Sequence, residues 1–292
     1  MDFATLGALC ALGSAVAWAL TSLLGRSLTP RFGTLAINAA RTTLCAVLFA
    51  AWMVALGDFA GLAALSARSL GLLLVSIVAA IAIGDTVFFE STRMLGLGRA
   101  MTLSMSYPVV AAVLAALLLD EHITARIALG GLLTLGGLAL VVATRDDAAV
   151  SSRSWLGIGA ACVAALAWGV SVVALRVPLA EIDALTAQLV RLPLAAALLW
   201  AMPWSWRDLP ALARGGRDVA LRLGVLSVLT TLSSVMYVLS IKHAGVAVAT
   251  VLSSTAPLFA VPLGVVFLGE RLPPIALVGA GVAVIGVVVL KL

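Results

Sequence analysis

The sequence predicts an all-α integral membrane protein with ten transmembrane helices, arranged as two inverted-topology repeats of five helices. Three observations support this fold class. Of the 292 residues, 63% are hydrophobic and 11% are charged, whereas soluble domains carry about 25% charged residues. The apolar residues form runs about as long as a membrane-spanning helix of roughly 20 residues. The pattern of runs also recurs in the second half of the chain.

Ten apolar runs, bounded by Arg, Asp, Pro or Gly, are expected to be the spanning helices. In chain order they cover residues 6–24, 34–56, 69–92, 100–119, 126–143, 156–175, 184–202, 219–240, 246–267 and 275–290. None shows the strict two-residue alternation of a transmembrane barrel strand. Gly and Pro within the runs are compatible with membrane helices, because neighbouring helices can satisfy the freed backbone groups. The sequence therefore predicts ten helices, no strands and no extramembrane domain.

The rest of the composition excludes several function classes. The formal net charge is +5, but the basic residues are scattered and form no block that could follow a nucleic-acid backbone. Cys10, Cys45 and Cys162 lie inside apolar runs, and His122 and His243 stand alone, which predicts neither disulfides nor a metal site. We expect no nucleic-acid partner and no cofactor. The first run is expected to remain a span, because no basic signal-peptide segment precedes it.

The spacing of rare residues reveals a tandem duplication. Trp18 and Arg41 are each followed by the same residue 150 positions later, at Trp168 and Arg191. After a one-residue gap, six more pairs lie 149 positions apart: Arg93 and Lys242, Gly96 and Gly245, Pro108 and Pro257, Glu121 and Glu270, Gly130 and Gly279, and Gly137 and Gly286. The expected repeats are residues 1–145 and 146–292. Because five helices is an odd number, the second repeat enters the membrane from the opposite side, as in many secondary transporters.

Several of these segments resemble a known family. They are the Ala-rich stretches Ser14–Trp18 and Ala164–Trp168, the Arg of the second helix of each half, and the segments Leu103–Pro108 with Asp120–His122 and Leu252–Pro257 with Gly269–Arg271. Together they resemble the EamA family of the drug/metabolite transporter superfamily over roughly residues 5–290. The first copy departs from the second by having Asp120 where the second has Gly269. The similarity is specific for the family and not for a substrate.

The resemblance implies a ten-helix carrier in the plasma membrane, which in a bacterium is the inner membrane. Many members of the family export amino acids and related metabolites. The resemblance also implies a central cavity, lined mainly by helices one, three and four and by their counterparts six, eight and nine.

Two arginines lie deep within predicted spans. Arg41 and Arg191 each follow about eight residues of helix, which places them roughly 10 Å deep. Asn38 and Gln188 precede them by three residues and so share their helix faces. A charge at the helix centre costs about 2.5–3.5 kcal/mol on insertion scales, so each arginine should face protein or water. Either these polar patches meet a substrate carboxylate, or the arginines snorkel or bond helix-end carbonyls and lock the scaffold.

Asp85 is the least expected residue of the chain. It lies in the predicted third span, near the side from which Arg41 enters the second span, so the two are candidates for an ion pair. The repeat places Ser234 at the equivalent position, so the symmetry breaks here. Asp85 is either a group that binds a coupling proton or a substrate amine, or a partner in a structural ion pair. Glu90, near Arg93, is expected to be a solvated charge at the membrane rim.

Aromatic and proline-containing segments complete the candidate site. Trp18 and Trp168 lie some twelve residues into their spans, where they either face each other across a cavity or pack in the interior. Pro108 and Pro257 each follow a group of hydroxyl residues, which suits a hinge or an irregular stretch that lines a cavity. The further lining candidates are Ser104, Ser106, Tyr107, Tyr237, Ser253 and Ser254.

The helix ends carry information on capping, packing and orientation. Glu121 and Glu270 are expected at the N-termini of the fifth and tenth helices, where the helix dipole favours a carboxylate. The glycines of these two helices suit close packing, by default within a monomer, although a dimer is possible. Eleven basic residues in the odd-numbered loops, against five on the other side, predict odd loops in the cytoplasm. The resemblance implies the reverse, with cytoplasmic termini.

The sequence favours a secondary-active carrier, not an enzyme, that exports amino acids or related small metabolites by alternating access around a midplane cavity. No phosphate-binding Gly-Lys-Ser/Thr motif is present, so a gradient is the expected energy source. The alternatives are a carrier of other small solutes such as nucleosides or drugs, a passive channel, and an intramembrane enzyme. The enzyme is the weakest of these, because the histidines have no catalytic partners at suitable spacing.

Overall fold

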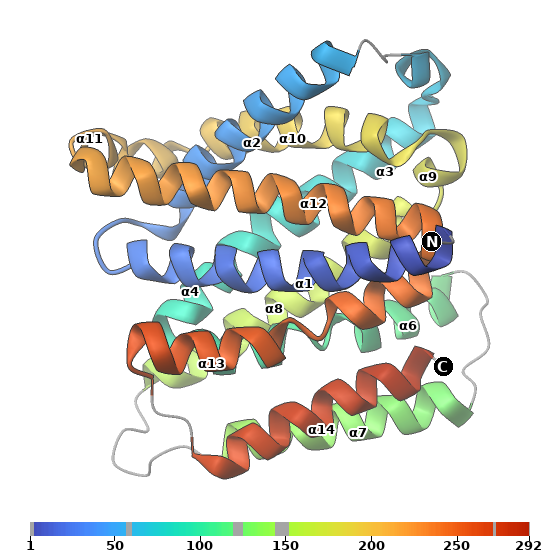
Figure 1. Ribbon diagram of the computed structural model, residues 1–292, viewed down its shortest axis with the longest axis vertical. Coiled ribbons are helices and arrows are strands. Elements are labelled where there is room, and N and C mark those ends of the chain that lie inside the picture. The colour runs from blue at the N-terminus through green and yellow to red at the C-terminus, as the bar shows by residue number, and fades with distance from the viewer. Residues whose placement is uncertain (1–2, 57–59, 119–124, 144–151, 271–272, 292) are drawn as a thin grey trace.

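The computed structural model describes residues 3–56, 60–118, 125–143, 152–270 and 273–291 (Figure 1). Every regular element in these ranges is a helix, and no strand occurs among them. The prediction of an all-helical chain is therefore confirmed for the described residues.

The first half contains nine elements in the described ranges. Eight follow the predicted spans in order, and one short 3-10 helix lies between the second and third spans. They are α1 (Phe3–Leu28), α2 (Thr34–Leu56), η1 (Ala60–Ala64), α3 (Ala67–Ile77), η2 (Val78–Asp85), α4 (Thr86–Leu95), α5 (Leu97–Ser104), α6 (Tyr107–Leu118) and α7 (Ala125–Ala143). The predicted third span corresponds to α3, η2 and α4 together, and the fourth to α5 and α6.

The second half repeats this order with short helical turns inserted between the longer helices. Its elements are α8 (Ser152–Leu175), α9 (Pro178–Glu181), α10 (Ala184–Ala201), η4 (Pro203–Trp206), α11 (Leu209–Ala213), α12 (Gly216–Ser253), α13 (Ala256–Leu268) and α14 (Pro274–Lys291). The predicted boundary between the eighth and ninth spans, at residues 241–245, is wrong, because α12 continues through it. Lys242 and His243 interrupt the apolar run, but neither residue type prevents a helix from continuing.

Within the described ranges, seven helices are long and apolar enough to cross a membrane. Three shorter apolar helices, Ala128–Gly137, Ala256–Leu268 and Pro274–Val289, lie in the regions predicted for the fifth, ninth and tenth spans. The chain is thus a multi-pass membrane protein, and the count of ten spans stays a prediction.

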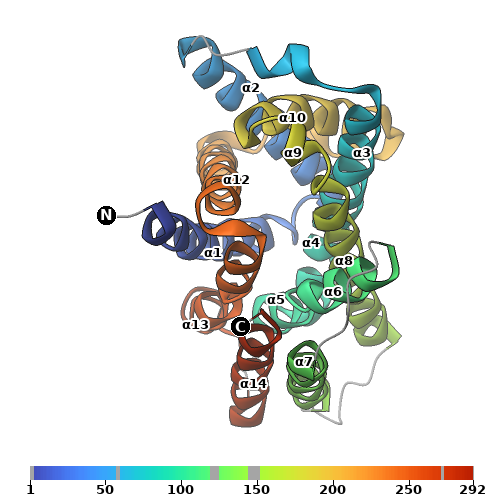
Figure 2. The same cartoon turned by 90° about the vertical axis from the view of Figure 1, so that its right-hand side faces the viewer.

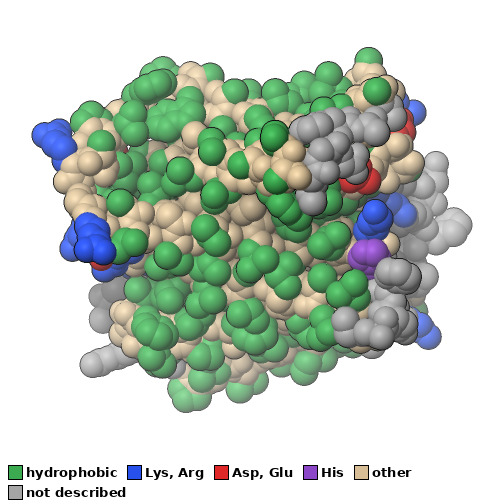
Figure 3. All heavy atoms as spheres, turned by 45° about the horizontal axis from the view of Figure 1, so that its top comes forward, with side chains coloured by type: hydrophobic (Ala, Val, Ile, Leu, Met, Phe, Trp, Pro, Cys, Tyr) green, Lys and Arg blue, Asp and Glu red, His purple; other side chains and the backbone are tan. Residues whose placement is uncertain are grey.

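The outer surface has the polarity expected of a protein in lipid. Large apolar side chains point outward from several helices, among them Val54 on α2, Leu117 on α6 and Val266 on α13, each more than 60% exposed. Figure 3 shows hydrophobic side chains across the middle of one face, with Arg and Lys gathered toward its two ends. An apolar surface of this extent is suited to contact with acyl chains and not with water.

Helices of the first half pack mainly against helices of the second. Helix α1 lies along α12, α2 along α10, and α4 and α6 along α8. Helices α7 and α14 form a separate pair at one edge of the bundle, which Figures 1 and 2 both show. The interior between the two halves is therefore enclosed by elements from both.

The α7 and α14 pair is held together by close backbone contact at glycines. A Cβ atom at Gly137 would overlap the backbone of Ala283, and one at Gly286 would overlap the backbone of Thr134. These glycines thus serve packing within the chain, the default expectation from the sequence. Gly281, also on α14, faces open space.

Substitution of Gly286 by Ala is expected to destabilise the protein by about 1–3 kcal/mol, because an added methyl group overpacks a closed contact. Gly281→Ala is the matched control on the same helix, since it adds the same methyl group without a neighbour. Thermal unfolding in detergent should show a lower Tm for Gly286→Ala than for Gly281→Ala. Equal Tm values would contradict the close packing of α7 and α14.

Candidate functional site

A cavity of about 190 Å³ lies between the two halves. Its walls come from α1, α2 and η2, from the break between α5 and α6, and from α8, α10 and α12. Nine of the residues that the sequence singled out line it: Trp18, Arg41, Asp85, Tyr107, Trp168, Gln188, Arg191, Tyr237 and Ser253. The structure therefore brings most of the candidate residues to one place.

Arg41 and Asp85 form a buried ion pair in this cavity. The Nη2 atom of Arg41 lies 2.6 Å from Oδ2 of Asp85, and the arginine is only 1% exposed. The guanidinium also lies 5.2 Å from the ring centroid of Phe89 and 6.0 Å from that of Trp18, within the range of cation–π attraction. The arginine thus does not snorkel to the surface, and its charge is compensated inside the protein.

Asn38 and Trp168 hold the two partners in position. The side-chain oxygen of Asn38 accepts a hydrogen bond from Arg41 at 2.5 Å, and its amide nitrogen donates to the carbonyl of Ile81 at 2.8 Å. The indole N–H of Trp168 donates to Oδ1 of Asp85 at 3.0 Å. Both carboxylate oxygens of Asp85 therefore have donors, one from each half of the chain.

The segment that ends at Asp85 is a π-helix, η2, where the sequence predicts an uninterrupted regular helix. Backbone carbonyls of its wider turns accept hydrogen bonds from side chains. The carbonyl of Ala80 accepts from the indole N–H of Trp168 at 3.2 Å, and that of Ile81 accepts from the amide of Asn38. Gly84 provides the necessary space, because a Cβ atom there would lie 2.6 Å from Nε1 of Trp168. Short π-helical segments are frequent at functional sites, and this one positions Asp85.

The second half repeats this arrangement without the carboxylate. Nη1 of Arg191 donates to the side-chain oxygen of Gln188 at 2.8 Å, as Arg41 does to Asn38. The amide nitrogen of Gln188 donates to the hydroxyl of Ser234, the repeat counterpart of Asp85. Among the described residues, no carboxylate lies within ion-pair distance of Arg191, which is 8% exposed. Arg41 and Asp85 neutralise each other, so the ionisable lining of the cavity has a net charge of +1.

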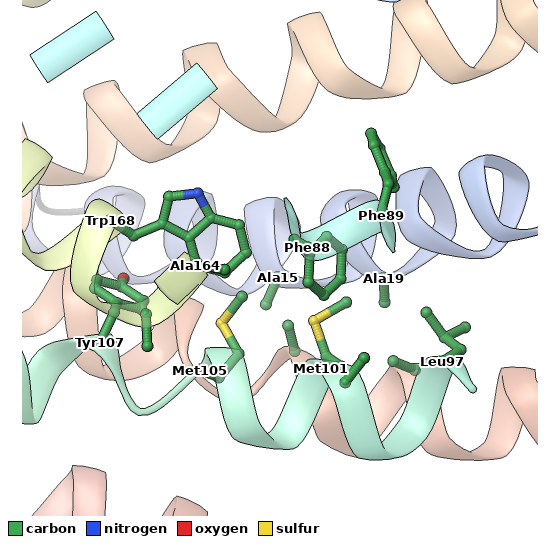
Figure 4. Packing of buried hydrophobic residues seen from close by; sticks show 14 residues of the cluster. Ala15, Ala19, Phe88, Phe89, Leu97, Met101, Met105, Tyr107, Ala164 and Trp168 are labelled. Atoms are coloured by element: carbon green, nitrogen blue, oxygen red, sulfur yellow. The ribbon is translucent and has the colours of Figure 1, made fainter. Parts of the chain in front are cut away.

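Aromatic side chains form the apolar wall. The rings of Trp18 and Trp168 are 5.8 Å apart in an edge-to-face arrangement, and Phe88 lies 5.3 Å from Trp168. Tyr107 packs edge-on to Trp168 at 6.2 Å. Figure 4 shows Trp168 and Tyr107 beside Met105 within this cluster. The two tryptophans therefore both line the cavity and contact each other.

The remaining hydroxyl candidates bond to the backbone and do not line this cavity. Ser104, Ser106 and Ser254 donate to the carbonyls of Ala161, Leu103 and Thr250. Pro108 and Pro257 lie in the first turn of α6 and α13, directly after the breaks at residues 105–106 and 254–255. The interruptions are thus present in both halves, and the role of the prolines as hinges stays a prediction.

Glu270 has a different role from the one predicted. Its carboxylate accepts from the backbone N–H groups of Leu97 at 2.5 Å and Gly98 at 3.2 Å, and so caps α5 instead of its own following helix. Gly269, with φ +65°, ends α13 and turns the chain toward this contact. The equivalent Glu121 lies outside the described residues. Glu90 contacts Arg93 at the surface, as expected.

Two serines of the site could also be identified from the sequence. Ser14 on α1 and Ser233 on α12 both line the cavity and are hydrogen-bonded to each other, with 3.1 Å between their hydroxyl oxygens. Both are hydroxyl residues within apolar helices, and this pattern marks them as candidates for the site.

In the part of the chain that the structure describes, no group of three or more His, Cys, Asp or Glu residues is placed to bind a metal.

Removal of the Asp85 charge is expected to be strongly destabilising. Asp85→Asn leaves the buried Arg41 uncompensated, which should lower the free energy of unfolding by about 3–5 kcal/mol. Asp218→Asn is the matched control, because Asp218 pairs with Arg222 at 3.0 Å but its side chain is 60% exposed; such surface pairs contribute about 0–1 kcal/mol. Unfolding midpoints in detergent report both changes. A similar small shift in both variants would show that the Arg41 charge is compensated by other means.

Comparisons with known proteins agree with this architecture. The profile of the EamA-like transporter family matches residues 5–143 and again residues 155–292. A Pseudomonas aeruginosa relative, Uncharacterized protein PA1977, is 35% identical over 139 residues, which are 48% of this chain and 46% of the relative. This chain thus matches about half the length of that relative.

A solved structure, described as a crystal structure of a protein, has a TM-score of 0.65 to this chain at 18% identity, over 97% of this chain and 95% of that chain. At this identity the likeness concerns the fold alone. The two family matches, one in each half, cover nearly all of the sequence. The chain therefore belongs to the EamA-like transporter family of the drug/metabolite transporter superfamily.

Proposed function

We propose that this protein is a secondary-active carrier that exports amino acids or related small metabolites by alternating access. The observation that carries the proposal is the cavity between the two halves, in which a buried charge network meets an aromatic wall. Carriers built from inverted repeats bind their substrates near the midplane, between the repeats. The bacterial inner membrane is the proposed location.

The lining suits a small amphipathic solute. Charged and hydroxyl groups from α2, α10 and α12 are placed to bind polar groups, while Trp18, Trp168 and Tyr107 offer an apolar surface. Binding sites of this kind combine a mainly apolar wall with a few polar groups that fix the orientation of the ligand. Amino acids have both parts within one small molecule.

Asp85 is the candidate for a coupling proton, because it is the acidic residue among the described residues that line the cavity. A proton on Asp85 would have to compete with Arg41, so coupling would loosen the ion pair during the cycle. A pH gradient that drives uptake in the wild-type protein, but not in folded Asp85→Asn, would support this role. Equal pH responses would assign Asp85 to structure alone.

Counterflow in proteoliposomes tests the carrier proposal. Vesicles loaded with a mixture of unlabelled amino acids should transiently accumulate a labelled amino acid from outside, because a carrier exchanges solutes across a two-state cavity. Val172→Trp fills the cavity and should abolish the accumulation. Val170→Trp, on the same helix, is 37% exposed at the outer surface and is the matched control.

The outcomes separate the alternatives. A folded protein that exchanges nucleosides but no amino acid would be a carrier of another solute class. Equilibration without transient accumulation would indicate a passive channel. If the folded wild-type protein exchanges none of these solutes, the transport proposal is refuted.

A further inference from the structure

We infer that the second half contains a binding site for the carboxylate of the solute, at the place that Asp85 occupies in the first half. This inference rests on the proposed function for its biological meaning.

The first half shows which groups hold a carboxylate in this framework. Arg41 donates to Asp85 and Asn38, and Trp168 donates to the second oxygen of Asp85. The arginine, the amide and the carboxylate belong to one half, and the tryptophan comes from the other. A guanidinium and an indole N–H thus surround an acceptor with two oxygens.

The repeat provides equivalents of these donors, an arginine in the second half and a tryptophan in the first. Arg191 corresponds to Arg41 and Trp18 to Trp168, each 150 residues away, and Gln188 takes the place of Asn38. Gln188 accepts from Arg191 just as Asn38 accepts from Arg41. At the position of the carboxylate, 149 residues after Asp85, the chain has Ser234.

Buried donors around the cavity are left without acceptors. Nε of Arg191 and Nε1 of Trp18 have no hydrogen-bond partner among the described residues, and both side chains line the cavity. Nε and Nη1 of Arg41 are also unpartnered, but Arg41 has an ion pair with Asp85, whereas Arg191 has no carboxylate within ion-pair distance among the described residues. Arg191 is more than nine-tenths buried. Leaving a buried donor unsatisfied costs about 1–3 kcal/mol, and more for a charged group. An unpartnered donor of a buried cation that lines a cavity and has no ion-pair partner among the described residues indicates a ligand that supplies the acceptor.

A carboxylate fits these donors best. When ionised it only accepts hydrogen bonds, through two oxygens, and charge-assisted bonds to arginine are about twice as strong as neutral ones. One negative charge would also balance the net charge of +1 on the lining. Asp85 itself is the example, bound by the same residue types in the first half.

Ser234→Asp provides a test that needs no knowledge of the natural substrate. If the site is built for a carboxylate, the new side chain should pair with Arg191 and raise the Tm above that of Ser234→Asn. Asn has nearly the same size as Asp but no charge, so the comparison isolates the charge. A lower Tm for Ser234→Asp than for Ser234→Asn would overturn the inference, because it would mean that the site rejects a carboxylate.

Ligand binding gives a second measurement on the full-length protein in nanodiscs. The probes are 3-phenylpropionate, its uncharged amide 3-phenylpropanamide, and chloride as a simple anion. We expect the propionate to raise the Tm of wild-type protein and to bind at least about tenfold more tightly than the amide, the minimum expected from a charged hydrogen bond. The propionate should bind about tenfold more weakly to Ser234→Asp than to Ser234→Asn.

Arg191→Gln keeps the test decisive if Ser234→Asp does not fold. This variant should lose the preference for the propionate over the amide. Equal binding of the propionate and the amide to wild-type protein, or an effect of chloride equal to that of the propionate, would overturn the carboxylate site. If the propionate binds as expected but no solute shows counterflow, the site stands and the transport proposal fails. If amino acids exchange but Arg191→Gln and Ser234→Asp leave their affinity unchanged, the transport proposal stands and the site fails.

Discussion

The centre of this structure depends on one constraint, that a charge buried away from water must be compensated by an opposite charge. Arg41 is almost fully buried in a helix that crosses the apolar layer, and it is compensated by Asp85 on a neighbouring element. To bring the two together, the third span adopts a π-helix and has glycine at position 84, which lets Trp168 reach the carboxylate. One ion pair thus determines local backbone geometry, side-chain packing and a contact between the halves.

Much of this could be predicted from the sequence, for identifiable reasons. Apolar runs of membrane length reveal helices, and the equal depth of Arg41 and Asp85 on one side of the membrane predicts their pairing. The π-helix could not be predicted, because its residues have the composition of any apolar helix. The contact of Glu270 with α5 also could not be predicted, because it depends on how segments 173 residues apart meet in space. Local patterns identify elements, whereas these features arise from packing between elements.

The duplication makes the two halves informative about each other. Both retain an arginine bonded to an amide three residues earlier, and each contributes a tryptophan to the wall of the shared cavity. They differ where Asp85 is replaced by Ser234. The pair in the first half is therefore neutral, which suits a structural role, whereas Arg191 in the second half has no carboxylate within ion-pair distance among the described residues, which suits recognition. The repeat shows that the halves differ at Asp85 and Ser234, and the missing carboxylate at Ser234 indicates what the second half can bind.

The connectivity of the bonds also constrains how the halves can move. Arg41, Asn38 and Asp85 all belong to the first half, and Arg191, Gln188 and Ser234 all belong to the second. A rocking motion between halves can therefore leave both charge networks intact. The bonds that it would break at the centre include those of the Trp168 indole N–H and the hydroxyl pairs Ser14–Ser233 and Ser76–Ser171. A neutral hydrogen bond contributes about 0.5–1.5 kcal/mol and one to a charged group, such as that from Trp168 to Asp85, about 1.5–3 kcal/mol. Both are less than the cost of breaking a buried ion pair, about 3–5 kcal/mol. A solute held by Arg191 and Trp18 would bridge the halves in the same way, so that its arrival and departure act directly on the contact that has to change.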